Sequence, residues 1–154
     1  MRPPEVLDPA GDEECLHAAI RAGADAVYFG VQAFNARARA TNFSTEDLPR
    51  ILRTLHASGV KGYVALNTLV FDHELGELER TLRAAAAAGV DAIIVQDLGV
   101  LRLARAIAPE LPVHASTQMT CTDASSVALA ARLGACRVVV ERPPMASLVR
   151  HWPE

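Results

Sequence analysis

The chain has 154 residues, of which 51% are hydrophobic and 21% are charged, and its formal net charge is −3. This apolar fraction excludes a disordered chain and is enough to build the core of one domain. The isoelectric point of about 5.9 argues against a strongly basic nucleic-acid-binding surface. An odd number of cysteines, three, argues against a disulfide framework.

One unit recurs along the chain and predicts strands that alternate with helices. Each copy ends a helical stretch with a glycine, which follows a small residue in three of the four copies, and a continuous apolar run comes within a few residues. The four runs are 26–30, 62–67, 92–97 and 137–141. Glycine suits the left-handed residue that closes a helix, and continuous apolar runs are typical of strands covered on both faces.

Two further strands, at 6–8 and 113–116, are predicted without that glycine. Leucine and isoleucine at helical spacing predict amphipathic helices between the strands, among them 48–55 and 75–82. A last helix is expected near Ala146.

Alternation of strands and helices with short connections predicts an α/β fold with a parallel sheet. An open doubly wound sheet and a (β/α)8 TIM-type barrel both satisfy this pattern. No glycine-rich nucleotide-binding loop follows a strand, and polar residues gather where strands end, so the barrel is favoured. A complete barrel takes about 200–250 residues. We therefore expect one partial TIM-barrel domain over 1–154, with about six parallel strands, five to six helices, and the last βα units absent.

In a βα barrel the active site is built where the strands end. The residues at these positions form one predicted mouth: Asp8, Gly11, Arg37, Arg39, Asn42, Asn67, Gln96, Asp97, His114, Ser116, Gln118 and Arg142. His114 is the candidate general acid/base, because the ordinary pKa of histidine lies near neutrality. It also shares a polar stripe of period two with Ser116 and Gln118.

The other residues of this mouth are candidate substrate-binding groups. Arg37, Arg39 and Arg142 suit an anionic group, because guanidinium binds carboxylate and phosphate through two hydrogen bonds. A structural interpretation stays open at each position: a core histidine, solvated loop arginines, and backbone hydrogen bonding by Asp8 and Asn67. The sequence has no metal-binding motif, and no metal site is predicted.

Several strings resemble the first part of the peptidase U32 family. They are PAG at 9–11, GADAVYFG at 23–30, RARATNFS at 37–44, NTL at 67–69, QDLG at 96–99 and HASTQM at 114–119. The strings occur in order over nearly the whole chain, and the last is specific. Asp8 departs from the alanine that usually precedes Pro-Ala-Gly in the family, and Pro143 follows Arg142 where the family often has glutamate.

The resemblance implies a family of enzymes with more than one chemistry. Some members carry out oxygen-independent hydroxylation of a tRNA or rRNA base or of a ubiquinone precursor, and others are labelled collagenase-like proteases. An iron–sulfur cluster held by four cysteines is present in some members, in the later half of the catalytic region. The resemblance therefore implies no cofactor in this chain, and a cluster only in full-length relatives.

Three functions follow as expectations. The first is the N-terminal barrel part of an enzyme of RNA-base or ubiquinone-precursor hydroxylation, the second is a peptidase, and the third is a truncated, non-catalytic binding or assembly module. The chain alone is expected to be inactive, and its unpaired sheet edges favour self-association. Small-molecule, peptide or RNA substrates are expected for intact relatives. With neither a secretory signal nor a membrane span in the sequence, a cytoplasmic location is expected.

Overall fold

The computed structural model describes residues 4–36 and 42–140, over which six parallel strands form one sheet in chain order. The strands are β1 (Leu7–Ala10), β2 (Ala26–Gly30), β3 (Lys61–Leu66), β4 (Ala92–Val95), β5 (Val113–Ala115) and β6 (Arg137–Val138). The helices are α1 (Glu13–Ala22), α2 (Leu48–Ala57), α3 (Leu75–Ala88), α4 (Leu98–Ile107) and α5 (Ala124–Arg132).

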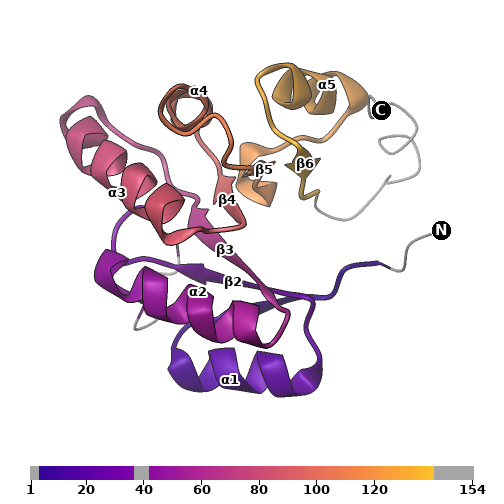
Figure 1. Ribbon diagram of the computed structural model, residues 1–154. Helices are drawn as coiled ribbons and strands as arrows, with labels where there is room; N and C mark the ends of the chain where they lie inside the picture. The colour runs from indigo at the N-terminus through magenta and orange to yellow at the C-terminus, as the bar shows by residue number, and fades with distance from the viewer. Residues whose placement is uncertain (1–3, 37–41, 141–154) are drawn as a thin grey trace.

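The sheet curls into a half-barrel, and Figure 1 shows the helices on its outer side. This confirms the incomplete (β/α)8 barrel expected from the alternating pattern. Three short 3-10 turns, η1 (Thr45–Asp47), η2 (Asp72–Glu74) and η3 (Thr117–Met119), follow β2, β3 and β5 along the chain. The helix expected near Ala146 lies outside the described residues.

The two faces of the sheet have different surroundings. The large core lies between the sheet and the helices, and its strand residues include Val27, Phe29, Val64, Ile93 and Val113. The concave face carries a smaller cluster made of Ala26, Tyr63, Ala92 and Ile94, against which Leu7 and Tyr28 pack. Because side chains alternate along a strand, positions in register with this second cluster also face the concave side. In β5 and β6 these are His114 and Arg137, which pair with each other.

The repeated unit fixes the start of a strand relative to the strand before it. Gly23 and Gly89 close α1 and α3 with φ angles of 87° and 77°, which glycine adopts without strain. Two residues later, the Asp25 carboxylate accepts a hydrogen bond from the Val6 amide at 2.8 Å. In the same way the Asp91 carboxylate accepts one from the Gly62 amide at 2.8 Å.

The predicted helix faces agree with the structure except at one position. The predicted face of α2 is buried, and so are Leu78 and Leu82 of α3, but Leu75 is 45% exposed. Leu75 is the first residue of α3, and the helix reaches the core only one turn later.

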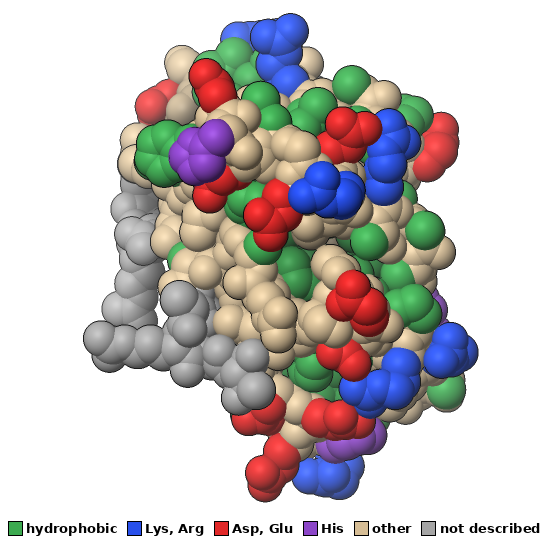
Figure 2. Space-filling view, turned by 90° about the vertical axis from the view of Figure 1, so that its left-hand side faces the viewer, with side chains coloured by type: hydrophobic (Ala, Val, Ile, Leu, Met, Phe, Trp, Pro, Cys, Tyr) green, Lys and Arg blue, Asp and Glu red, His purple; other side chains and the backbone are tan. Residues whose placement is uncertain are grey.

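The outer surface carries charges of both signs. On the face drawn in Figure 2, acidic and basic side chains are interspersed rather than gathered into a patch of one sign. Among the described residues, no helix is both long enough and apolar enough to cross a membrane.

Candidate functional site

A cavity of about 500 Å³ opens on the concave face, where the strands end. Three residues of the predicted mouth, Asn67, Ser116 and Gln118, come together in its wall. The other residues that line it are Leu7, Tyr28, Ala36, Ala65, Ile94, Thr117 and Val139. Of these, Tyr28 is the one aromatic residue, and it was missed from the sequence because it reads as an ordinary apolar residue of a strand.

Local structure fixes the polar groups of this wall. Ser116 ends the extended segment of β5 and caps η3, where its hydroxyl oxygen accepts a hydrogen bond from the Gln118 amide at 3.2 Å. Asn67 follows β3, and its side-chain oxygen accepts a hydrogen bond from the Ala36 amide at 3.1 Å. These bonds occupy acceptor positions, so the Ser116 hydroxyl hydrogen and the Asn67 amide hydrogens are available to donate.

The loop between β2 and α2 is held at both ends beside this cavity. The Asn42 amide donates to the Gly11 carbonyl at 3.1 Å, and the Asn42 side chain accepts from the Asn35 amide group at 2.7 Å. Asn35 in turn lies against Gly30, where a Cβ would be only 1.6 Å from the Asn35 nitrogen. The loop folds directly onto residue 30, and this close approach requires a glycine there.

Three predicted anion contacts, Arg37, Arg39 and Arg142, lie outside the described residues. Arg37 follows Ala36 directly in the chain, and Ala36 lines the cavity. The described part of the cavity wall contains no charged side chain.

Gln96 and Asp97 lie in an adjoining cavity of about 410 Å³, which Gln118 also lines. Asp97 has a structural task there: its carboxylate accepts hydrogen bonds from the amides of Gly99 at 2.6 Å and Val100 at 3.3 Å, and so caps α4. Its other oxygen accepts from the Val70 amide at 3.3 Å and fixes the loop after β3.

Asp8 lies on the opposite face of the sheet from His114. It pairs in register with Val27, whose side chain belongs to the core beneath the helices. Gly11 contributes its carbonyl oxygen to the Asn42 contact. The structure thus brings Asn67, Ser116 and Gln118 to one cavity and places Asp8 away from it.

His114 lies on the concave face but is not among the residues that line the cavity, and it is only 5% exposed. Its ring meets the Tyr63 ring edge to face, with 4.9 Å between centroids. Burial, together with the positive charges of Arg137 and Lys61, lowers the pKa of His114 to about 4, although Glu5 acts in the opposite direction. The imidazole is therefore neutral at physiological pH.

A charged cluster that sequence reasoning missed lies near the amino ends of the strands. The Glu5 carboxylate accepts hydrogen bonds from Lys61 at 2.8 Å, Tyr63 at 2.7 Å and Arg137 at 2.7 Å. Burial opposes ionisation of Glu5, but these three bonds outweigh it and lower the pKa of Glu5 to about 2. A basic residue stands at the first position of β3 (Lys61) and of β6 (Arg137), and this pattern is the signal in the sequence that could have revealed the cluster.

The described residues do not fit an iron–sulfur cluster. The chain has three cysteines, one fewer than the four expected to hold the cluster in some members of the family it resembles. Cys15 and Cys136 are exposed, Cys121 is buried, and burial raises the pKa of the Cys121 thiol, which disfavours the thiolate that binds metal. No three His, Cys, Asp or Glu side chains within 4–36 and 42–140 gather to hold a metal ion.

Comparison with known protein families identifies one family for this chain. The family model described as peptidase family U32 matches residues 11–147. A solved structure described as a U32 peptidase superposes with a TM-score of 0.75 at 15% identity, covering 98% of this chain and 66% of that one. That likeness supports the fold.

Relatives with assigned names carry two kinds of activity. A collagenase of Porphyromonas gingivalis is 41% identical over 80% of this chain and 30% of its own length. The tRNA hydroxylation protein P1 of Bacillus subtilis is 35% identical over 98% of this chain and 36% of its own length. A 23S rRNA 5-hydroxycytidine synthase of Escherichia coli is 38% identical over 90% of this chain and 20% of its own length. The chain thus spans about a third or less of these relatives.

Proposed function

Because this chain belongs to peptidase family U32, we propose that it forms the N-terminal part of a barrel that hydroxylates an RNA base. One observation carries the proposal: Asn67, Ser116 and Gln118 converge on a cavity at the carboxyl ends of the strands, where βα barrels place their chemistry. The relatives named for tRNA hydroxylation and for rRNA hydroxycytidine synthesis support an RNA substrate.

The proposal assigns the 154 residues to one partial-barrel domain, and the rest of the catalytic region to residues outside this chain. Cluster ligands, where an intact protein has them, would come from those other residues. The chain's own groups bind and orient the substrate, with Arg37, Arg39 and Arg142 as proposed anion contacts. His114 remains the candidate acid/base, acting from its buried position as a neutral imidazole. A cytoplasmic location follows from a tRNA or rRNA substrate.

One specific observation supports each of two other functions. Peptide hydrolysis is favoured by the relative named collagenase. An assembly role is favoured by β1 and β6, each of which pairs with only one other strand among the described residues, since unpaired strands promote self-association. Sedimentation of the chain tests the assembly role: a concentration-independent monomer would count against it.

A chimera tests the proposed function. The matched segment of the Bacillus subtilis tRNA hydroxylation protein P1 is replaced by this chain, and the chimera is expressed in a strain that lacks tRNA hydroxylation activity. Hydroxylated nucleosides in digested tRNA and rRNA, measured by mass spectrometry, are expected with the chimera but not with the 154-residue chain alone. Asn67→Ala is expected to lower the yield about tenfold, whereas the surface variant Glu79→Gln is expected to preserve it. A folded chimera that cleaves gelatin and hydroxylates no RNA would favour the peptidase instead.

A further inference from the structure

The cavity of about 410 Å³ beside Asp97 is a groove between α4 and α5, called the α4–α5 groove below. Its wall is mainly apolar: Leu98 begins α4, Leu129 and Ala130 belong to α5, and Leu69 reaches the groove from the loop after β3. Apolar side chains that gather around a groove at the surface of a protein mark an interaction site.

Exposed apolar side chains concentrate at this groove. Six large hydrophobic side chains are exposed among the described residues, and three of them line the groove: Leu69 is 62% exposed, Leu98 43% and Leu129 42%. Phe71, which is 64% exposed, stands two residues after Leu69 in the same loop. A single exposed leucine is normal, but several around one groove are typical of a surface that another polypeptide segment covers.

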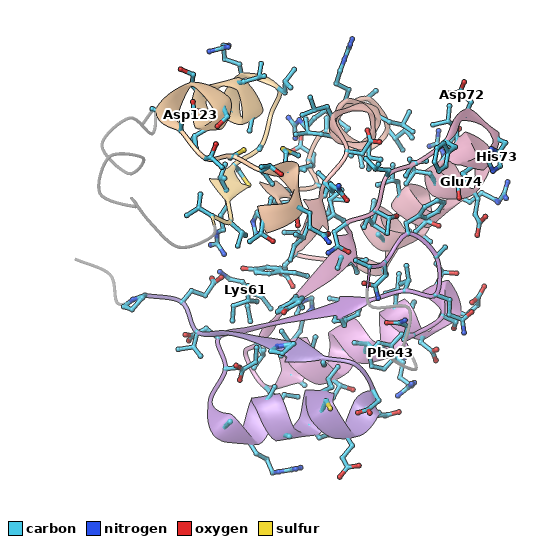
Figure 3. All side chains as sticks on the ribbon, turned by 180° about the vertical axis from the view of Figure 1, so that it is seen from behind. Phe43, Lys61, Asp72, His73, Glu74 and Asp123 are labelled. Carbon is cyan, nitrogen blue, oxygen red and sulfur yellow. The ribbon has the colours of Figure 1, made fainter. Side chains whose placement is uncertain are left out.

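The charges around the groove disfavour a phosphate backbone. Among the described residues that line it, Asp97 is the one charged side chain. Asp72 and Glu74 belong to η2, Asp123 caps α5, and Figure 3 places these carboxylates on either side of α4. Surfaces that bind RNA neutralise its phosphates with basic residues, so this acidic rim repels RNA. It favours an occupant that carries lysine or arginine beside its apolar side chains.

The path of the chain indicates where such an occupant comes from. The described residues end at 140, just beyond the carboxyl end of β6. The groove opens at the same end of the sheet, because Gln96 follows β4 and Gln118 follows β5. Most of the length of a relative such as the tRNA hydroxylation protein P1 lies outside the segment that this chain matches. Further βα units of a barrel would adjoin β6 and β1 rather than α4, so they leave this groove open.

We propose that the α4–α5 groove is a docking surface for a segment of the intact protein that follows the barrel in the sequence. The segment is apolar where it fills the space between Leu69, Leu98 and Leu129, and basic where it meets the acidic rim. The proposal rests on the part of the proposed function that assigns this chain to a longer protein, and not on the reaction. Because Gln118 lines both cavities, the docked segment lies next to the proposed substrate cavity.

Photocrosslinking in the chimera with the Bacillus subtilis tRNA hydroxylation protein P1 tests this proposal. The photoreactive residue benzoyl-phenylalanine replaces Leu98 or Leu129, and mass spectrometry identifies the peptide that is joined to it after irradiation. The expected peptide belongs to the P1 part of the same molecule, beyond the replaced segment. Leu75 is the matched control position, because it is exposed and apolar but does not line the groove, and no crosslink to that peptide is expected from it.

Charged substitutions give a second measurement. Leu98→Glu combined with Leu129→Glu is expected to make the P1 part of the chimera about tenfold more sensitive to proteolysis, because carboxylates in the groove prevent docking. In the 154-residue chain the same pair is expected to leave the thermal unfolding temperature nearly unchanged, since both side chains already face solvent. Leu75→Glu is the control and is expected to change neither measurement. An equal loss of stability in the isolated chain and in the chimera would mean that the two leucines only complete the core.

Three crosslinking results would overturn the proposal: a crosslink from position 98 or 129 to a second copy, a crosslink to RNA, or no crosslink in a folded chimera. Each is distinct from failure of the proposed function, which is measured by hydroxylated nucleosides. A chimera that hydroxylates RNA without the crosslink refutes only the docking, and a crosslinked chimera that hydroxylates no RNA refutes only the reaction.

Discussion

Glu5 and Arg137 are 132 residues apart in the sequence, yet the Glu5 carboxylate accepts a hydrogen bond from the Arg137 guanidinium at 2.7 Å. Glu5 precedes β1 and Arg137 begins β6, so the ion pair joins the two edges of the sheet across its concave side. Lys61 of β3 bonds to the same carboxylate, and Figure 3 places it between the N-terminal segment and β6. One carboxylate thus links three strands.

Glu5→Gln is expected to destabilise the fold by about 1–2 kcal/mol, because Arg137 and Lys61 lose their shared anion. Urea denaturation followed by circular dichroism measures the loss. Glu79→Gln is the control, since Glu79 pairs with Arg83 on the exposed face of α3 and its loss should cost less than about 0.5 kcal/mol. Equal losses of stability in the two variants would show that the Glu5 cluster stabilises the fold no more than an exposed ion pair does.

Acid is expected to destabilise the chain first through His114. Its pKa is about 4 in the folded state and near 6.5 when unfolded, so between these values only the unfolded chain binds the proton. Stability therefore rises with pH across this window, by up to about 3 kcal/mol for a shift of this size. In His114→Gln the slope between pH 4 and 6.5 should flatten. An unchanged slope in this variant would mean that another group controls it.

A second loss of stability is expected at lower pH from Glu5. Its folded pKa of about 2 lies below the unfolded value of 4.5, so its contribution is complete above pH 4.5 and disappears as the pH falls toward 2. Glu5→Gln should remove this part of the acid transition, and because Glu5 raises the pKa of His114, it should extend the His114 part toward lower pH. Chemical denaturation at a series of pH values separates the two.

Gly30→Ala is expected to displace the loop between β2 and α2, because the new Cβ would overlap the Asn35 side chain and break its bond to Asn42. The expected cost is about 1–2 kcal/mol, with faster amide hydrogen exchange at Asn42. Gly76→Ala is the matched control: its Cβ would meet nothing closer than Arg80 at 3.8 Å, so α3 should gain up to about 1 kcal/mol. A rigid loop in the Gly30 variant would contradict the contact.

Asp97 allows capping to be separated from substrate binding. Asp97→Ala should cost about 1 kcal/mol through loss of the α4 cap. Asp97→Asn should cost less, because asparagine keeps the cap and loses only the acceptor for the Val70 amide. Both free energies come from thermal unfolding. If Asp97→Asn kept its stability but abolished RNA hydroxylation in the chimera, the carboxylate would belong to the substrate site after all.

Most of the fold could be predicted because its signals are local. The glycines and the apolar runs act within a few positions of themselves, and so do the side chains of Asp12 and Asp123, which cap α1 and α5. The ends of β3, β4, β5 and β6 were predicted too late, whereas the end of β2 was predicted correctly and β1 ends two residues later than predicted. Asp97 and Ser116 read as continuations of apolar runs, but their oxygens cap the elements that follow.

The site was only partly predictable because its contacts are distant in the sequence. The direction of the Asp8 side chain depends on the register of β1 with β2. The low pKa of His114 depends on its burial and on the positive charges of Arg137 and Lys61. None of these relationships lies within one βα unit. The three residues Asn67, Ser116 and Gln118 do line one cavity, because the ends of parallel strands meet at one edge of the sheet whatever the details of packing. Their role in substrate binding stays a prediction.

The aspartates that follow the helix-closing glycines have a consequence for how such a barrel can grow. Asp25 holds the backbone just ahead of β1, and Asp91 does the same for the start of β3. These two units thus carry the information for their own alignment with the preceding strand, independently of units further along. A half-barrel built in this way could accept additional βα units at β6 without realigning the strands already in place, a modularity suited to assembly by duplication or by recombination of segments.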